Sequence, residues 1–144
     1  MQGTLERPAY YWAGEVDVIR VCEEYDLGMH VGNALKYVVR AGSKGDEAAD
    51  LRKAAEYLRR WQAWGERGGR PDLRGGLGLE WMDPAAVADA FEDIGYAPWR
   101  RPVVVALVEA ACTIDEEELI GKALGLIEAR LAEIAAETEG ASCG

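Results

Sequence analysis

The sequence has few residues of the types that build metal sites and nucleophilic triads. His30 is the single histidine, which excludes a metal site made of several imidazoles and a Ser-His-Asp triad with a spare base. The three cysteines, Cys22, Cys112 and Cys143, are odd in number and far apart, so they match no metal-binding or redox spacing. We therefore interpret them as incidental thiols of a reducing compartment.

Long apolar runs are also missing. The longest covers residues 103–108, well short of the roughly 20 residues that a membrane-spanning helix needs. The N-terminus lacks the basic start followed by an apolar stretch that marks a secretory signal. We expect a cytoplasmic protein without a membrane partner.

Positive charge is scarce and unevenly placed. The chain has 16 Lys and Arg against 26 Asp and Glu, a formal net charge of −10, which argues against general nucleic-acid binding through phosphate contacts. Residues 1–70 hold 11 basic and 11 acidic residues, whereas residues 71–144 hold 5 basic and 15 acidic ones. An anionic ligand is therefore expected on the N-terminal half.

What the chain does contain is helical periodicity, over 144 residues that suit one small bundle. Apolar spacing, caps and breakers predict helices at about residues 15–25, 29–41, 46–64, 83–95, 102–111 and 115–137, with a frayed tail beyond. No strand pattern of useful length is present. We predict an all-α fold, an antiparallel helical hairpin core plus C-terminal helices in a small helical bundle.

Glycine divides the sequence into three regions. Residues 65–82 form a Gly-rich loop, whose glycines match neither GxGxxG nor GxxxxGK[ST] and are joined by no lysine. We interpret this loop as a plain connection. Residues 1–64 form an N-terminal helical region, and residues 83–144 form a C-terminal helical region that packs on the first or contacts another subunit.

One face of the second predicted helix carries polar groups that suit an anionic ligand. Asn33, Lys36, Tyr37 and Arg40 stand at i, i+3, i+4 and i+7, and side chains at these offsets share a face. Arg40 can bind a phosphate through two N–H groups, and a lysine acts as a point charge. A solvated helix face with mixed charges is the simpler alternative.

The third predicted helix adds a matching stripe. Asp50, Lys53 and Tyr57 stand at i, i+3 and i+7, and the short turn before this helix, which contains Lys44, predicts that the two helices are antiparallel neighbours. The tyrosines, with Trp12, offer ring faces on which a base can stack. Asp50 could hold a ribose hydroxyl, orient a lysine or bind Mg²⁺.

The segments HVGNALKYVVRAGSKG (residues 30–45) and DLRKAAEYL (residues 50–58) carry a specific resemblance. They resemble the SaV-like domain family of bacteriophages, whose pattern is roughly G-N-x-x-K-Y-x-x-R-x-G-x-K followed by D-L-x-K-A-x-x-Y-L. The segment YWAGEVDVI (residues 11–19) is similar to the usual lead of that family. The resemblance covers about residues 8–62, and the region after Gly65 resembles nothing we can name.

The resemblance implies a phage-encoded, nucleotide-handling protein of the host cytoplasm. Most family members have no assigned function, but some are nucleotide kinases that phosphorylate deoxynucleoside monophosphates without a P-loop. The leading hypothesis is therefore a P-loop-less nucleoside monophosphate kinase. Its catalytic residues would be Lys36, Arg40, Lys53 and Asp50, and its substrate-binding residues would be Gly32, Asn33, Tyr37, Gly42, Lys44 and Tyr57, with Tyr11 and Trp12 from the lead. The family's opening His-Tyr is absent here, where Ala9 and Tyr10 stand.

Two other functions remain open. A non-enzymatic sponge that sequesters a nucleotide second messenger of host anti-phage defence would use the same basic face. A nucleotide pyrophosphohydrolase like the all-helical MazG group ranks third, because its E-x-x-E…E-x-x-D pattern is absent and only Asp46, Glu47, Asp50 and Glu56 lie near the site. No dedicated metal site is predicted, the cofactor is unknown with Mg²⁺ as a candidate, and a homo-oligomer is expected.

Overall fold

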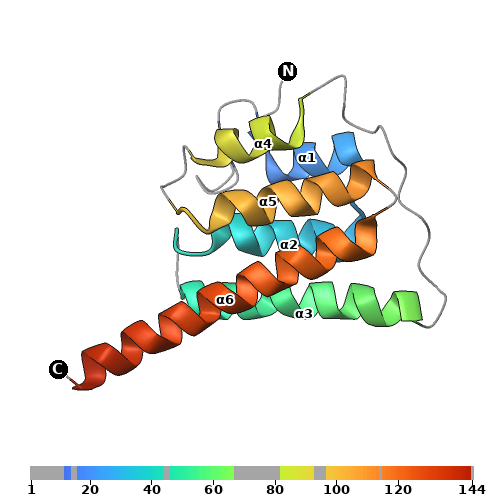
Figure 1. Ribbon diagram of the computed structural model, residues 1–144. Coiled ribbons are helices and arrows are strands. Elements are labelled where there is room, and N and C mark those ends of the chain that lie inside the picture. The colour runs from blue at the N-terminus through green and yellow to red at the C-terminus, as the bar shows by residue number, and fades with distance from the viewer. Residues whose placement is uncertain are drawn as a thin grey trace.

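The computed structural model describes residues 12–13, 16–43, 46–66, 82–92, 97–113 and 115–143. Within these ranges the elements are β1 (Trp12–Ala13), β2 (Val16–Asp17), α1 (Val18–Tyr25), α2 (Gly28–Arg40), α3 (Glu47–Glu66), α4 (Pro84–Phe91), α5 (Arg100–Glu109), the 3-10 helix η3 (Ala110–Cys112) and α6 (Glu116–Cys143). The two short strands pair antiparallel and were not predicted. The predicted fold, a small all-α bundle, is confirmed (Figure 1).

The α2–α3 hairpin is the centre of the fold. Gly42 follows α2 with a φ of +83°, a left-handed conformation that glycine adopts without a steric penalty. Asp46 then caps α3, because its Oδ1 accepts a hydrogen bond from the backbone N–H of Ala49 at 3.2 Å. The two helices run side by side in opposite directions, as the short connection predicted (Figure 1).

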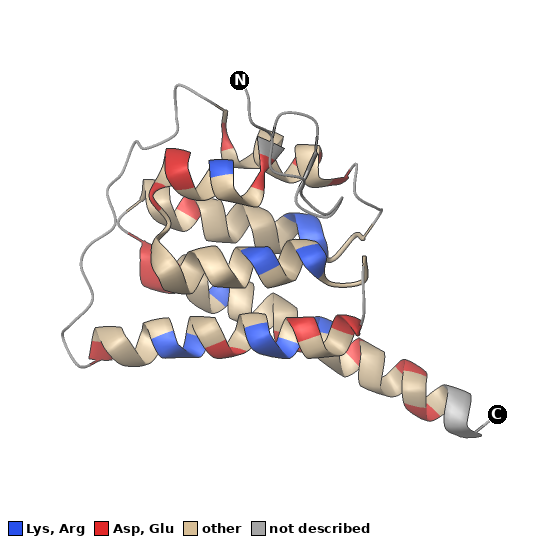
Figure 2. Cartoon of the chain, turned by 180° about the vertical axis from the view of Figure 1, so that it is seen from behind, with Lys and Arg blue, Asp and Glu red and all other residues tan. Residues whose placement is uncertain are grey.

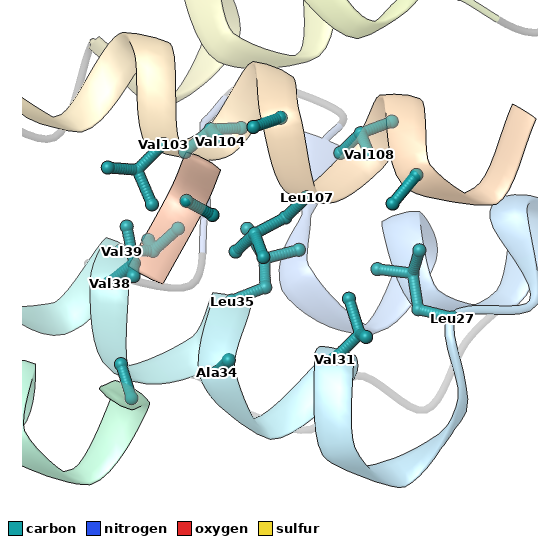
Figure 3. Close-up of a cluster of buried hydrophobic side chains, with 14 of the residues drawn as sticks. Leu27, Val31, Ala34, Leu35, Val38, Val39, Val103, Val104, Leu107 and Val108 are labelled. Carbon is teal, nitrogen blue, oxygen red and sulfur yellow. The ribbon is translucent and has the colours of Figure 1, made fainter. Parts of the chain in front are cut away.

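Helix α5 packs on the side of α2 that faces away from α3. Figure 3 shows Val103, Val104, Leu107 and Val108 of α5 directed toward Val31, Leu35, Val38 and Val39 of α2, and all eight side chains are buried. Burying an aliphatic side chain of this size contributes about 1.5–3 kcal/mol relative to exposure. Helix α2 is therefore held between two neighbours, and its remaining polar side is presented from a rigid support.

Three helices, α1, α3 and α4, begin at an aspartate cap. Asp83 accepts a hydrogen bond from the N–H of Ala86 at 2.8 Å, with Pro84 in the first turn of α4. Asp17 caps α1 in the same way, so this helix begins later than predicted. Helix α5 begins at Arg100, ahead of the proline expected to open it.

Helix α6 crosses α3 and α5 and then projects from the bundle (Figure 1). In the first half of this helix, the side chains of Ile120, Ala123 and Ile127 are buried in the core. The predicted end near Glu137 is wrong, because the helix continues to Cys143. Alanine and glutamate have high helix propensity and can extend a helix that is already nucleated by packing.

Candidate functional site

Six of the predicted site residues lie together on the open side of the hairpin. Lys36, Tyr37 and Arg40 come from α2, and Asp50, Lys53 and Tyr57 come from α3. We call this set the cationic face. Contacts between the two helices, reported below, involve five of the six, and Lys36 contacts Tyr37 within α2. The prediction that the two polar stripes lie side by side therefore describes the structure correctly.

Two tyrosine rings form the middle of the cationic face. The rings of Tyr37 and Tyr57 are stacked with their centroids 6.1 Å apart and their planes 15° apart. The Nζ atom of Lys36 lies 4.6 Å from the Tyr37 ring centroid, and that of Lys53 lies 5.4 Å from the same centroid. Both distances fall within the ~6 Å over which a ring face attracts a cation.

Arg40 and Asp50 pair across the hairpin beside the rings. Arg40 Nε lies 3.5 Å from Asp50 Oδ2, with 37% of the arginine side chain but only 7% of the aspartate side chain exposed. Burial raises the pKa of Asp50, and this effect is opposed by the positive charges of Arg40 and Lys53. The aspartate is thus a buried anchor, whereas part of the arginine side chain is open to solvent, although its Nε atom is buried.

Two further arginines hold the ends of these helices. Arg100, at the start of α5, donates from Nη2 to the carbonyl oxygen of Ala41 at 3.0 Å and from Nε to that of Val38 at 3.4 Å. These carbonyls belong to the last turn of α2, where the helix itself supplies no donors. Burial lowers the pKa of Arg100, an effect that Glu47 opposes.

The start of α3 is tied to α6. Arg130 donates from Nε to Glu47 Oε2 at 2.9 Å and from Nη2 to Oε1 at 3.1 Å, a two-bond pair. The same guanidinium contacts Glu133 and Glu137 at 3.0 and 3.3 Å. These ion pairs raise the pKa of Arg130. Glu47, at one end of the cationic face, therefore serves to join α3 to α6.

Three of the predicted substrate-binding residues contact protein atoms. A Cβ built on Gly32 would lie 3.1 Å from Cys22 Sγ, so glycine allows α1 and α2 to approach closely. Asn33 Nδ2 donates to the carbonyl oxygen of Met29 at 2.9 Å, within α2. Gly42 makes the turn between the helices. Each of the three residues therefore has a structural role, and its part in substrate binding stays a prediction.

The remaining predicted residues cannot be placed on the site. Tyr11 and Lys44 lie outside the described residues, and only the backbone of Trp12 is described, in β1.

Burial raises the pKa of Cys22 to about 11 and also raises that of Cys112, which keeps both thiols protonated at neutral pH.

The surroundings of the cationic face are mixed in charge. Figure 2 shows basic and acidic segments alternating along α3, while the end of α6 nearest the C-terminus carries acidic segments only. Helix α2 contains Lys36 and Arg40 and no acidic residue. In the part of the chain that the structure describes, no group of three or more His, Cys, Asp or Glu side chains could hold a metal ion. Over the same residues, no helix is both long and apolar enough to cross a membrane.

Sequence reasoning missed the two arginines that support the site. Arg100 lies 62 residues from Val38 in the chain, and Arg130 lies 83 residues from Glu47. No local spacing links such distant positions. The one available signal was Arg130 itself, a lone cation in the otherwise acidic second half of α6.

The comparison with known protein families finds one similarity. Residues 5–59 match a family described as a protein of unknown function (DUF3310). No curated protein and no solved structure matches the chain. The matched segment contains every described residue of the cationic face and covers less than half of the chain. The similarity therefore concerns the hairpin and does not extend to α4, α5 or α6.

Proposed function

We propose that the cationic face binds the phosphate groups of a nucleotide, and that the protein is a phosphotransferase acting on nucleoside monophosphates. The observation that carries this proposal is the meeting of cations from two helices: Lys36 and Lys53 lie over the ring of Tyr37, and Arg40 pairs with Asp50 across the same hairpin. Phosphoryl transfer depends chiefly on positioning and on neutralising charge, which such a surface supplies.

Each cation has a distinct role in this proposal. Arg40 directs the exposed part of its planar guanidinium to a phosphate, to which it can donate two parallel hydrogen bonds. Lys36 neutralises the phosphate group that is transferred, and Lys53 faces the charge that develops on that same group. Asp50 orients Arg40 and Lys53 from beneath, because it is buried and interacts with both cations.

The resemblance of residues 8–62 to the SaV-like domain family of bacteriophages supports the choice of a nucleotide as ligand. In that family some members are nucleotide kinases without a P-loop. Of the positions of the family pattern that bear charge or an aromatic ring, the six that the structure describes belong to the cationic face. On this proposal the protein is encoded by a phage and acts in the cytoplasm of the host cell.

A second candidate is a nucleotide sponge that binds without turnover. The observation in its favour is the burial of Asp50, 7% exposed and paired with Arg40, because a carboxylate in that position does not reach out to activate an acceptor hydroxyl. The same cations would then retain a nucleotide second messenger intact. Both candidates use the same phosphate-binding face.

One chromatographic assay separates the two candidates. The purified protein is incubated with nucleoside mono-, di- and triphosphates and cyclic dinucleotides, with and without Mg²⁺, and the nucleotides are separated by anion exchange before and after denaturation. New diphosphates, formed as monophosphates and triphosphates decrease, would support the kinase. A compound that leaves the free pool and returns intact on denaturation would support the sponge, and an unchanged panel would reject both.

A further inference from the structure

We infer that Tyr37 is a positioning residue that holds the ammonium groups of Lys36 and Lys53 as a cradle for one phosphate group. In this arrangement the Tyr37–Tyr57 ring pair serves the phosphate of a ligand and not its base. The inference rests on the proposed function and deepens it, because it names the chemical group that the face recognises: a phosphate dianion, whatever it is attached to.

The first argument is that one ring orders two lysines from different helices. Lys36 Nζ lies 4.6 Å and Lys53 Nζ 5.4 Å from the centroid of Tyr37. A free lysine side chain loses much rotamer entropy when it binds, so a ring that already restrains the ammonium group lowers that cost. The ring attracts the cation through its π-face and leaves all three N–H donors of each ammonium available for a ligand.

The second argument is that the rings offer no slot for a base. A base inserted between two rings needs them about 7 Å apart, twice the ~3.4 Å spacing of stacked bases. The centroids of Tyr37 and Tyr57 are 6.1 Å apart, and both side chains are partly buried against the core, which resists their separation. Two ammonium groups also lie over the Tyr37 ring.

The third argument is charge balance. Within the cationic face, Lys36, Lys53 and Arg40 carry positive charge and Asp50 carries negative charge, so the net charge is two positive. A phosphate monoester carries about −1.5 to −2 at neutral pH. The face therefore neutralises a single terminal phosphate, whereas a polyphosphate chain would retain excess negative charge.

Two substitutions at Tyr37 test the cradle. Tyr37→Leu removes the ring, and Tyr37→Phe keeps the ring face but removes the hydroxyl. Calorimetric titration would use inorganic phosphate, one purine and one pyrimidine nucleoside monophosphate as probes. We expect Tyr37→Leu to weaken all three by the same factor, about tenfold if two cation–π contacts are lost, and Tyr37→Phe to bind like the unaltered protein.

Three results of this titration would overturn the inference. If Tyr37→Leu weakens the nucleotides but not inorganic phosphate, the ring stacks on a base. If Tyr37→Phe is as weak as Tyr37→Leu, the hydroxyl binds the ligand directly. Equal affinities for all three proteins would likewise exclude a positioning role.

A measurement without ligand keeps the inference separate from the proposed function. The ε-methylene protons of Lys36 and Lys53, assigned through Lys36→Arg and Lys53→Arg, should be shifted upfield by the Tyr37 ring current. The shift should persist in Tyr37→Phe and disappear in Tyr37→Leu. Its absence from the unaltered protein refutes the cradle even if Tyr37→Leu fails to fold, whereas a protein that shows the shift but binds none of the probes refutes the proposed function alone.

Discussion

Two lysines of the hairpin and two arginines of the C-terminal helices are held in different ways. Lys36 and Lys53 lie over a tyrosine ring. Arg100 also lies over a ring, that of Trp99, but it donates to backbone carbonyls, and Arg130 donates to three carboxylates. A ring restrains a cation without accepting its N–H groups. Carbonyls and carboxylates accept those groups, and a carboxylate also neutralises the charge. Cations of the first kind remain available to a ligand, and those of the second kind stabilise the fold.

The largest effect should follow from removing a ring-held cation. Lys36→Ala or Lys53→Ala should lower turnover, or ligand affinity for a sponge, about 100-fold or more, as the loss of one charge-stabilising donor does in other enzymes. The unfolding temperature should change little, because neither side chain is buried. Steady-state kinetics and thermal unfolding measure the two effects.

Arg52→Ala is the matched control, since Arg52 is exposed beside Lys53 on α3 but lies outside the cationic face. An equal loss of activity in this control would assign the effect to general charge. Arg40→Ala tests less cleanly, because it leaves the buried carboxylate of Asp50 without its ion pair and should also destabilise the fold.

The next effect concerns the fold-stabilising kind of cation. Arg100→Met should lower the free energy of unfolding by about 2–3 kcal/mol, because it leaves buried carbonyl oxygens at the end of α2 without their charged donor. Methionine keeps the apolar stem, so little packing is lost. Urea unfolding measures the change.

The neighbouring residue supplies the control for Arg100. Arg101 pairs with Asp89 on the surface, so Arg101→Met should cost about 1 kcal/mol or less. If both variants lose the same free energy of unfolding, the burial of Arg100 does not make its hydrogen bonds more stabilising than the surface ion pair of Arg101.

Local information in the sequence was sufficient for the hairpin. The helix face of Lys36 and Arg40, the glycine turn at Gly42 and the cap at Asp46 all lie within a few residues of their partners, where helical geometry is regular. The same regularity placed Asp50 and Tyr57 on the facing stripe. The prediction of which side chains converge therefore needed only two periodicities and a short connection.

Contacts between distant elements were not predictable in this way. The pair of Arg130 with Glu47 depends on how α6 crosses α3, and a single sequence carries no spacing signal for that crossing. The close approach at Gly32 was not predicted either, since the match to a family pattern carries no information on its distance to Cys22 of α1. The extension of α6 past Glu137 shows that propensity can continue a helix beyond its packed part.

A smaller effect compares two ion pairs between α3 and α6. The side chains of Arg130 and Glu47 are 18% and 25% exposed, and those of Arg59 and Glu128 are 54% and 51% exposed. Arg130→Met should lower the free energy of unfolding by about 1–3 kcal/mol because it breaks a partly desolvated two-bond pair. Arg59→Met should cost about 0–1 kcal/mol. If Arg130→Met and Arg59→Met lower the free energy of unfolding equally, exposure to solvent does not weaken the Arg59–Glu128 pair relative to the Arg130–Glu47 pair.

The smallest effect should come from the charge of Asp50 as the pH changes. Burial raises the pKa of Asp50 in the folded state, so the folded chain holds this proton more tightly than the unfolded chain does. Stability from this group is then present below the ordinary aspartate pKa of about 4 and is lost as the pH rises through the folded value. Asp50→Asn has no such proton to lose. The free energy of unfolding of the unaltered protein, relative to Asp50→Asn, should fall as the pH rises across this window.

Lys53→Met sharpens this test, because it removes one of the two positive charges that lower the pKa of Asp50. The fall in relative stability should then extend to higher pH. Unfolding in urea at several pH values measures both differences, and carboxylates common to each pair of proteins cancel. A relative stability that rises with pH would mean that Arg40 stabilises the carboxylate by more than burial costs it. Asp50 would then hold Arg40 as firmly as Glu47 holds Arg130, and Arg40 would belong with the cations that stabilise the fold.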